Sequence, residues 1–261
     1  MPGPASPRPL AARLSGAPES PPLVLLHSIG TDAGMWQPQL AALQAGHRVI
    51  ALDLPGHGAS AGDLCAAEMA AYAARVVETL DSYAIENCDL VGLSLGGMVA
   101  AAFALQYPER LQRLVICDAR LDAPAEYQTL WDDLIARTGE DGMDAVAAFM
   151  TERWFGTGVR AENPQVREIA AVLRRTPAAG FIRAAEAIRN MDLLAQAGDI
   201  TAPSLLLVGA KDGVLPELMG ELCGAMPRAR LEILPEAGHL SNVDQPDAFS
   251  TAVLAFLGNS V

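Results

Sequence analysis

An apolar run that ends in a Gly-x-Ser-x-Gly pentapeptide constrains this chain more than any other feature. The run and the pentapeptide occupy residues 88–96, and a segment of small residues continues from them to Tyr107, where a proline follows. Gly92 and Gly96 carry no Cβ, so backbone can approach closely on both sides of a strained turn. The pattern predicts a strand, a sharp turn and a helix, with the hydroxyl of Ser94 held out as a nucleophile at the helix N-terminus.

Apolar runs and amphipathic segments alternate along most of the chain. Short apolar runs predict strands that are buried on both faces, and apolar residues spaced three and four apart predict helices. This alternation implies parallel strands joined by right-handed crossovers, and therefore an α/β fold with a mostly parallel central sheet flanked by helices. The predicted strands span residues 10–14 (an edge strand), 23–27, 48–52, 88–93, 111–117, 204–208 and 231–234, and the predicted helices span 35–43, 66–83, 95–107, 216–225 and 244–257.

The alternation stops in the middle of the chain. Residues 121–197 show helical spacing with no strand pattern among them. A helical insertion between two strands of such a sheet would lie over the strand ends as a cap. We therefore predict an α/β core made of residues 1–120 and 198–261, with residues 121–197 as a helical cap.

Composition narrows the class of protein. A formal net charge of −13 argues against a nucleic-acid partner, because no basic stripe is present to neutralise phosphates. No apolar run is long enough to span a membrane, and the proline-rich start lacks the apolar centre of a signal peptide. We expect a cytoplasmic protein that uses no metal or organic cofactor, and a homo-oligomer is compatible with these features. Four cysteines without C-x-x-C spacing indicate reduced thiols: Cys65, Cys88, Cys117 and Cys223.

Histidine is the natural base for a serine nucleophile, whose hydroxyl is reactive only when a neighbouring group takes its proton. The chain has four histidines. His239 lies in a polar loop after the last predicted strand, at the carboxyl edge where catalytic groups of parallel sheets gather. His27 and His57 lie in turns, where we expect structural hydrogen bonds, and His47 begins a strand. His239 is therefore the predicted base for Ser94.

The base needs a carboxylate that fixes its tautomer and stabilises the imidazolium. Asp212 follows the predicted strand at residues 204–208, and the chain order Ser94, Asp212, His239 matches the order expected for this topology. Asp118 also follows a strand and is the second candidate. A Gly-flanked turn after the penultimate strand is the commoner place for this acid, which favours Asp212.

Two backbone N–H groups should hold the oxyanion that forms when the serine attacks a carbonyl. The first is the amide of Leu95, which directly follows the nucleophile. The second comes from the turn after the first buried strand, where we choose Ile29 and keep Ser28 as the alternative. Because the group used is a backbone amide, side-chain identity does not decide between the two.

Six segments carry a resemblance to a known family: residues 27–32, 35–36, 92–98, 152–155, 237–243 and 245–246. With these segments the chain resembles the α/β-hydrolase superfamily from Leu23 onward, and within it the 3-oxoadipate enol-lactonases. The resemblance implies an α/β-hydrolase fold with the helical cap inserted after the sixth strand. It also implies hydrolysis of 3-oxoadipate enol-lactone to 3-oxoadipate in aromatic-compound catabolism, with Ser94, Asp212 and His239 as the catalytic triad.

The implied substrate is a small carboxylated lactone or ester, which brings a negative charge into a water-poor cavity and needs a cationic partner. Arg120, just past a strand at the mouth of the cap, is the first candidate. Arg153 and Arg189 follow, with an exposed helix face as the alternative place for both. The aromatic side chains that could wall the pocket, or else belong to the core, are Trp36, Trp131 and Trp154.

The same residues leave other functions open. A carboxylesterase, a carbon–carbon bond hydrolase and a cofactor-free haloperoxidase would use the same triad, so only substrates separate them. A hydrolase-like binding protein without catalysis is the alternative of another class. That all three triad positions are filled favours an enzyme.

Overall fold

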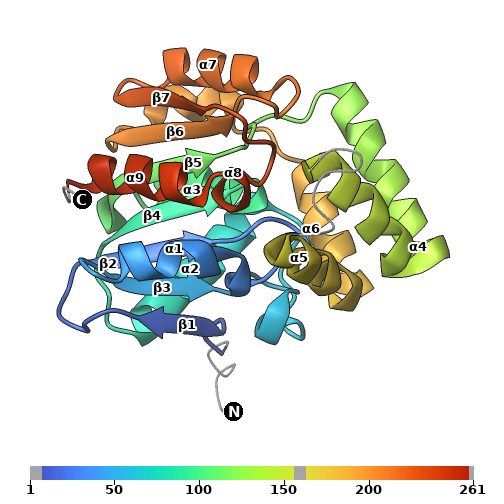
Figure 1. The fold of residues 1–261 in the computed structure, drawn as a ribbon, viewed down its shortest axis with the longest axis horizontal. Helices are drawn as coiled ribbons and strands as arrows, with labels where there is room; N and C mark the ends of the chain where they lie inside the picture. The colour runs from blue at the N-terminus through green and yellow to red at the C-terminus, as the bar shows by residue number, and fades with distance from the viewer. Residues whose placement is uncertain (1–7, 156–162, 259–261) are drawn as a thin grey trace, which may run out of the picture.

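The computed structural model describes residues 8–155 and 163–258, and the proline-rich start at residues 1–7 lies outside this part of the chain. Across the described residues, seven strands form one sheet in the order β1-β3-β2-β4-β5-β6-β7 (Figure 1). β1 pairs antiparallel with β3, and the other neighbouring strands are parallel, as the alternation predicts. The strands are β1 (Ala12–Ser15), β2 (Pro22–Leu26), β3 (Arg48–Leu52), β4 (Cys88–Leu93), β5 (Leu111–Cys117), β6 (Ser204–Gly209) and β7 (Ala229–Leu234).

Helices flank the sheet. α1 packs against α8 and α9 in front of the strands in Figure 1, whereas α2 and α3 pack against each other. The α-helices are α1 (Gln37–Leu43), α2 (Met69–Ser82), α3 (Leu95–Gln106), α4 (Ala125–Phe155), α5 (Pro164–Arg175), α6 (Ala178–Arg189), α7 (Leu215–Ala225), α8 (Ser241–Asp244) and α9 (Pro246–Leu257). Short 3₁₀ helices are η1 (Ala33–Trp36), η2 (Gly58–Ser60), η3 (Pro108–Arg110) and η4 (Leu194–Asp199).

The helical segment, residues 121–197, leaves the sheet after β5 and returns to it at β6. Its helices α5 and α6 both pack on α4 at one end of the sheet (Figure 1). A single β-bridge between Asp122 and Asp192 joins the two ends of the segment, and α4 bends at Gly142, whose φ is 76°. The segment follows the fifth described strand and not the sixth, because only β1 precedes β2 in the described residues. The division into core and cap stays a prediction.

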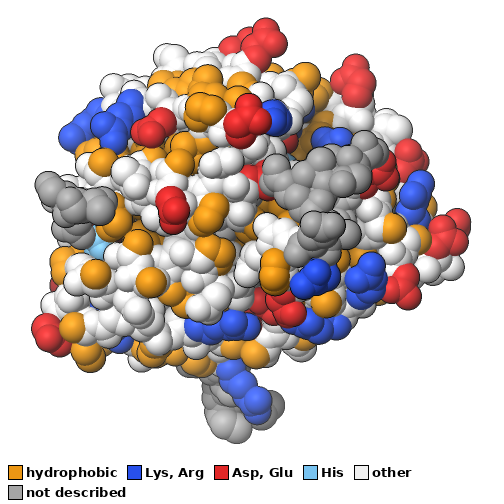
Figure 2. All heavy atoms as spheres, viewed as in Figure 1, with side chains coloured by type: hydrophobic (Ala, Val, Ile, Leu, Met, Phe, Trp, Pro, Cys, Tyr) orange, Lys and Arg blue, Asp and Glu red, His pale blue; other side chains and the backbone are white. Residues whose placement is uncertain are grey.

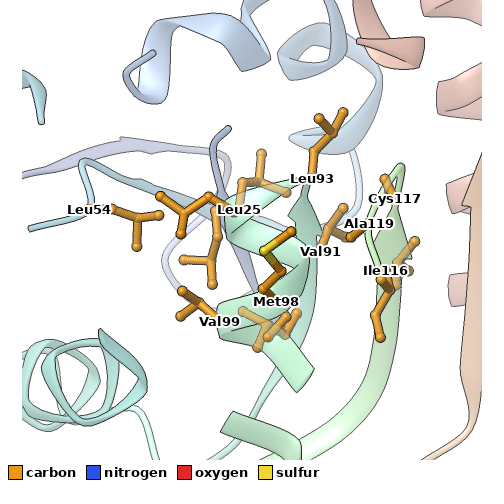
Figure 3. Close-up of a cluster of buried hydrophobic side chains, with 14 of the residues drawn as sticks. Leu25, Leu54, Val91, Leu93, Met98, Val99, Ile116, Cys117 and Ala119 are labelled. Atoms are coloured by element: carbon orange, nitrogen blue, oxygen red, sulfur yellow. The ribbon is translucent and has the colours of Figure 1, made fainter. Parts of the chain in front are cut away.

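The core covers both faces of the sheet. Leu25 of β2, Val91 of β4 and Ile116 of β5 are at most 1% exposed, and Met98 and Val99 of α3 belong to the same buried cluster (Figure 3). Burying each such side chain stabilises the fold by about 1.5–3 kcal/mol. Because β4 is buried along its whole length, the turn that follows it has a rigid base.

The surface is of mixed charge. On the face drawn in Figure 2, Lys and Arg side chains lie among Asp and Glu side chains, with small apolar patches between them. In the part of the chain that the structure describes, no helix is both long and apolar enough to cross a membrane.

Candidate active site

Ser94 occupies the tip of a sharp turn between β4 and α3. Its φ of 54° and ψ of −115° lie outside the usual regions for a residue with a side chain. Its amide donates to the Cys117 carbonyl at 2.9 Å. A Cβ on Gly92 would lie 2.1 Å from the Gly96 carbonyl oxygen, and one on Gly96 would lie 2.1 Å from that of Leu26. The two glycines of the pentapeptide are therefore required by backbone contacts on each side of Ser94.

The structure brings the three predicted catalytic side chains together. His239 Nε2 lies 3.0 Å from Ser94 Oγ, and His239 Nδ1 lies 2.8 Å from Asp212 Oδ2. Because Asp212 accepts the proton on Nδ1, Nε2 is left to accept from the serine hydroxyl. The imidazole stacks on Trp154 with ring centroids 6.2 Å apart, and the His239 amide donates to the Trp154 carbonyl at 3.3 Å. The loop that carries the base is thus held against α4.

Asp118, the second candidate for the acid, has other partners. Its carboxylate accepts from the Gly209 amide at 2.8 Å and from the Ser241 hydroxyl. Burial raises its pKa well above the usual value, and the nearby charge of Asp212 adds to this. Asp118 therefore ties together the strand end before Asp212 and the segment after His239, and among the described residues it makes no hydrogen bond with the imidazole.

The loop after β2 contributes the predicted oxyanion donors. Ile29 and Leu95 are buried, and within the described residues neither amide has a hydrogen-bond partner. The Ser28 amide donates to Met35 Sδ at 3.2 Å. This leaves Ile29 as the amide available to a ligand, and its role as a donor stays a prediction.

Two buried histidines hold the neighbouring turns. The Leu54 amide donates to His27 Nε2 at 2.9 Å, and the Gly30 amide donates to His57 Nε2 at 3.0 Å. Each ring therefore carries its proton on Nδ1, which donates to the carbonyl of Ser28 or of Pro55. Burial lowers the pKa of His27 to about 4 and that of His57 to about 3. These are the structural hydrogen bonds expected of the two turn histidines.

A cavity of about 180 Å³ opens at Ser94. One wall is the carboxyl edge of the sheet and the other is α4, so the helical segment closes over the serine. The lining from the sheet edge is Ile29, Ser94, Met98, Asp118, Arg120, Lys211, Asp212, Gly213, Val214, Leu215 and His239. The lining from α4 is Tyr127, Leu130, Trp131, Leu134, Met150, Arg153 and Trp154.

The predicted substrate-binding residues divide into two groups. Arg120, Trp131 and Trp154 line the cavity, as does the second arginine, Arg153. Trp36 lies outside it and is a correction: η1 turns its ring into the core, where it packs on Phe249 of α9 with centroids 6.0 Å apart. The third arginine, Arg189, is also outside the cavity, because its guanidinium pairs with Asp132 on the surface at 2.5 Å.

The cationic side chains of the cavity differ in how far they are neutralised. The Arg120 guanidinium lies 2.8 Å from Asp122 and 4.7 Å from the centre of the Tyr127 ring. Lys211 pairs with Glu236. Arg153, by contrast, has no ion pair within the described residues, and its side chain is exposed. Arg153 is therefore the cation of the cavity that no described carboxylate compensates, and it is available to a bound anion.

Sequence reasoning predicts Trp131 and Trp154 in the apolar wall from α4, but it misses the other apolar residues of that wall. Tyr127, Leu130 and Leu134 follow the same three- and four-residue spacing that predicted a helix there. The spacing marks the buried face, but it does not say that this face meets the serine. Among the described residues, no group of three or more His, Cys, Asp or Glu is placed to hold a metal ion.

Comparisons with known proteins agree with this fold. The model of a family described as the alpha/beta hydrolase family matches residues 23–252. The chain is 32% identical to the 3-oxoadipate enol-lactonase 2 of Acinetobacter baylyi over 244 residues, covering 93% of this chain and 90% of that protein. Among solved structures it matches a hydrolase from Pseudomonas aeruginosa PA01, with a TM-score of 0.90, 40% identity, and 95% of this chain and 94% of that chain covered. The enol-lactonase from Burkholderia xenovorans LB400 also matches with a TM-score of 0.90, at 31% identity, with 96% of each chain covered.

Proposed function

Because this chain belongs to the alpha/beta hydrolase family, we propose that it is a serine hydrolase that opens a carboxylated enol-lactone, 3-oxoadipate enol-lactone, to give 3-oxoadipate. The observation that carries the proposal is the hydrogen-bonded series from Ser94 through His239 to Asp212 at the floor of a cavity. The similarity to enol-lactonases supports the substrate.

In the first half of the reaction, Ser94 Oγ attacks the lactone carbonyl while its proton passes to His239 Nε2. Asp212 stabilises the imidazolium that forms. The amides of Ile29 and Leu95 donate to the oxyanion, and as fixed backbone donors they need no reorganisation when the charge develops. The ring carbon–oxygen bond then breaks, and the leaving enolate takes the proton from His239.

In the second half, water replaces the leaving group. His239 takes a proton from the water, whose oxygen attacks the acyl carbon, and a second tetrahedral oxyanion forms at the same donors. The bond to Ser94 Oγ breaks, and the serine recovers its proton from His239. The released enol becomes the ketone, so the net reaction adds one water to the lactone and leaves the protein unchanged.

The charge distribution of the cavity supports a carboxylated substrate. Arg153 lies on the lining, with no described carboxylate to pair with, whereas Arg120 is held by Asp122. A substrate carboxylate would compensate Arg153 in a partly apolar site, where charge-assisted hydrogen bonds are strong. We therefore assign the contact with the substrate carboxylate to Arg153 and a supporting place to Arg120.

The test is hydrolysis of 3-oxoadipate enol-lactone by the wild-type protein and by Ser94→Ala, followed by loss of ultraviolet absorbance. We expect rapid hydrolysis by the wild type and a loss of about 10³-fold or more in the variant. If the wild type ignores the lactone but cleaves 4-nitrophenyl acetate through Ser94, the chain is an esterase or related hydrolase and the proposed substrate is wrong. Absence of both activities would favour a binding protein.

A further inference from the structure

The carbonyl of Ser28 is unusually well bonded for a loop residue. It accepts from the Thr31 hydroxyl at 2.7 Å, from the Thr31 amide at 3.2 Å and from His27 Nδ1 at 2.8 Å. All three residues are at most 1% exposed. The direction of the histidine bond is fixed, because His27 Nε2 already accepts from the Leu54 amide and so Nδ1 carries the proton.

The bonded carbonyl belongs to the same peptide unit as the Ile29 amide. A trans peptide is planar, so its N–H points away from its C=O. Donors that fix the direction of the Ser28 carbonyl therefore also fix the direction of the Ile29 N–H. Ile29 lines the cavity that contains Ser94, and the bonded carbonyl points in the opposite direction within the same peptide plane.

Hydrogen bonds also hold the neighbouring peptides in place. The Gly30 amide donates to His57 Nε2 at 3.0 Å, and the Gly96 amide at the start of α3 donates to the His27 carbonyl at 3.1 Å. The loop that carries Ile29 is thus hydrogen-bonded to the helix that begins at Leu95, the other predicted oxyanion donor. Hydrogen bonds in series also polarise one another, which makes the free N–H a better donor.

We propose that Thr31 and His27 are positioning residues that clamp the Ser28–Ile29 peptide and so aim the Ile29 N–H at the oxyanion. The inference rests on the proposed function and adds residues that do not touch the substrate. Without these bonds, the Ser28–Ile29 peptide could rotate in the ground state and would have to turn back when the oxyanion forms. The clamp therefore acts on the chemical step. Its loss lowers kcat and leaves KM nearly unchanged.

The test compares Thr31→Val, which removes the hydroxyl at nearly constant volume, with Thr31→Ser, which keeps it. We expect Thr31→Val to lower kcat by about tenfold or more. This effect is smaller than the loss of about 10²–10³-fold that follows removal of a whole oxyanion donor. Thr31→Ser should stay within about threefold of the wild type. Thr138→Val is the matched control, because Thr138 is also buried and donates to a carbonyl, that of Leu134, but lies outside the cavity lining.

A second readout separates positioning from folding. A boronic acid that adds to Ser94 imitates the tetrahedral species, whereas the product carboxylate imitates the ground state. Thr31→Val should lower the affinity for the boronic acid by the same factor by which kcat/KM falls. The affinity for the product should not change. If the valine variant is insoluble, Thr31→Ala serves in both assays.

Each outcome is decisive. Unchanged kcat and boronic-acid affinity in Thr31→Val would overturn the clamp, as would an equal loss in Thr31→Ser or in Thr138→Val. The assays use 4-nitrophenyl acetate beside the enol-lactone, so failure on the lactone alone counts against the proposed substrate and not against the clamp. If neither is cleaved through Ser94, the proposed function and the clamp both fail.

Discussion

The carboxyl edge of the sheet and the helical segment form the two walls of one cavity, yet they are built differently. At the edge, backbone atoms contact backbone atoms, and Ser94 and Asp118 adopt positive φ. The distances between the proposed catalytic side chains depend on hydrogen bonds between residues that follow different strands and lie far apart in the chain. In α4 the wall consists of side chains on a helix, and a Cβ on Gly139 or Gly142 would meet nothing within 4 Å.

The difference indicates a division of labour. On the proposed function, the edge determines which bond is broken, because it holds the proposed nucleophile, base, acid and oxyanion donors in fixed positions. We further propose that the helical segment selects the substrate, because its side chains can change without moving those groups. Three predictions test this comparison.

Glycine substitutions should separate the two walls most strongly. At Gly96 an added Cβ would lie 2.1 Å from a backbone oxygen, whereas Gly139 has open space in a helix. We expect Gly96→Ala to lower the free energy of unfolding by about 4 kcal/mol or more, and Gly139→Ala to raise it by up to about 1 kcal/mol. Urea unfolding followed by circular dichroism measures both. Similar small effects of the two substitutions would contradict the proposed difference in packing between the sheet edge and α4.

Acid should destabilise the edge through its buried histidines, whereas the helical segment contains no histidine. The pKa of His27 is about 4 and that of His57 about 3 in the folded protein, below the ordinary value of 6.5. The unfolded chain therefore binds protons first, and stability is lost as pH falls from about 6.5 toward the folded values. Between pH 7 and pH 5 we expect a loss of about 2 kcal/mol for each histidine.

The comparison variant for the acid prediction is His57→Gln. Its free energy of unfolding should fall by about 2 kcal/mol less than that of the wild type between pH 7 and pH 5. Urea midpoints at the two pH values supply the measurement. An identical fall in both proteins would mean that His57 is not held neutral.

Arginine substitutions test selection by α4, with the smallest expected effect. Arg153→Gln should raise KM for the carboxylated lactone by about tenfold, as expected for loss of a charge-assisted hydrogen bond from an exposed side chain, and leave KM for a neutral aryl ester unchanged. Arg189→Gln is the matched control, since Arg189 lies on the surface with Asp132. Steady-state kinetics with both substrates provide the readout. A larger effect on the neutral ester would contradict the assignment of Arg153.

Most of the edge could be predicted from the sequence, because its features are local. The pentapeptide around Ser94 encodes its own turn, and residues that follow parallel strands must meet at one edge. Asp212 and His239 could therefore be placed before the structure was known. The choice between Asp212 and Asp118 depends on which carboxylate the Gly209 amide and the Ser241 hydroxyl occupy, and no local pattern specifies those bonds.

The substrate-binding residues could be predicted only in part from the sequence. Trp36 follows the oxyanion turn in sequence, but η1 directs it toward Phe249, more than two hundred residues later. The position of Arg120 after a strand favours it as the cationic partner, yet Asp122 and Tyr127 hold its guanidinium. Such pairings depend on the packing of α4 against the sheet edge, which no local pattern specifies.

The most direct test of the central claim is labelling by a neutral fluorophosphonate, which reacts with an activated serine whatever substrate the helical segment selects. Mass spectrometry of the digested protein should find one phosphonyl group per chain on Ser94 in the wild type. Labelling should be slower by at least about 10²-fold in His239→Ala, which lacks the base. Labelling of another serine, or equal labelling without His239, would contradict the claim that the sheet edge alone creates the reactive nucleophile.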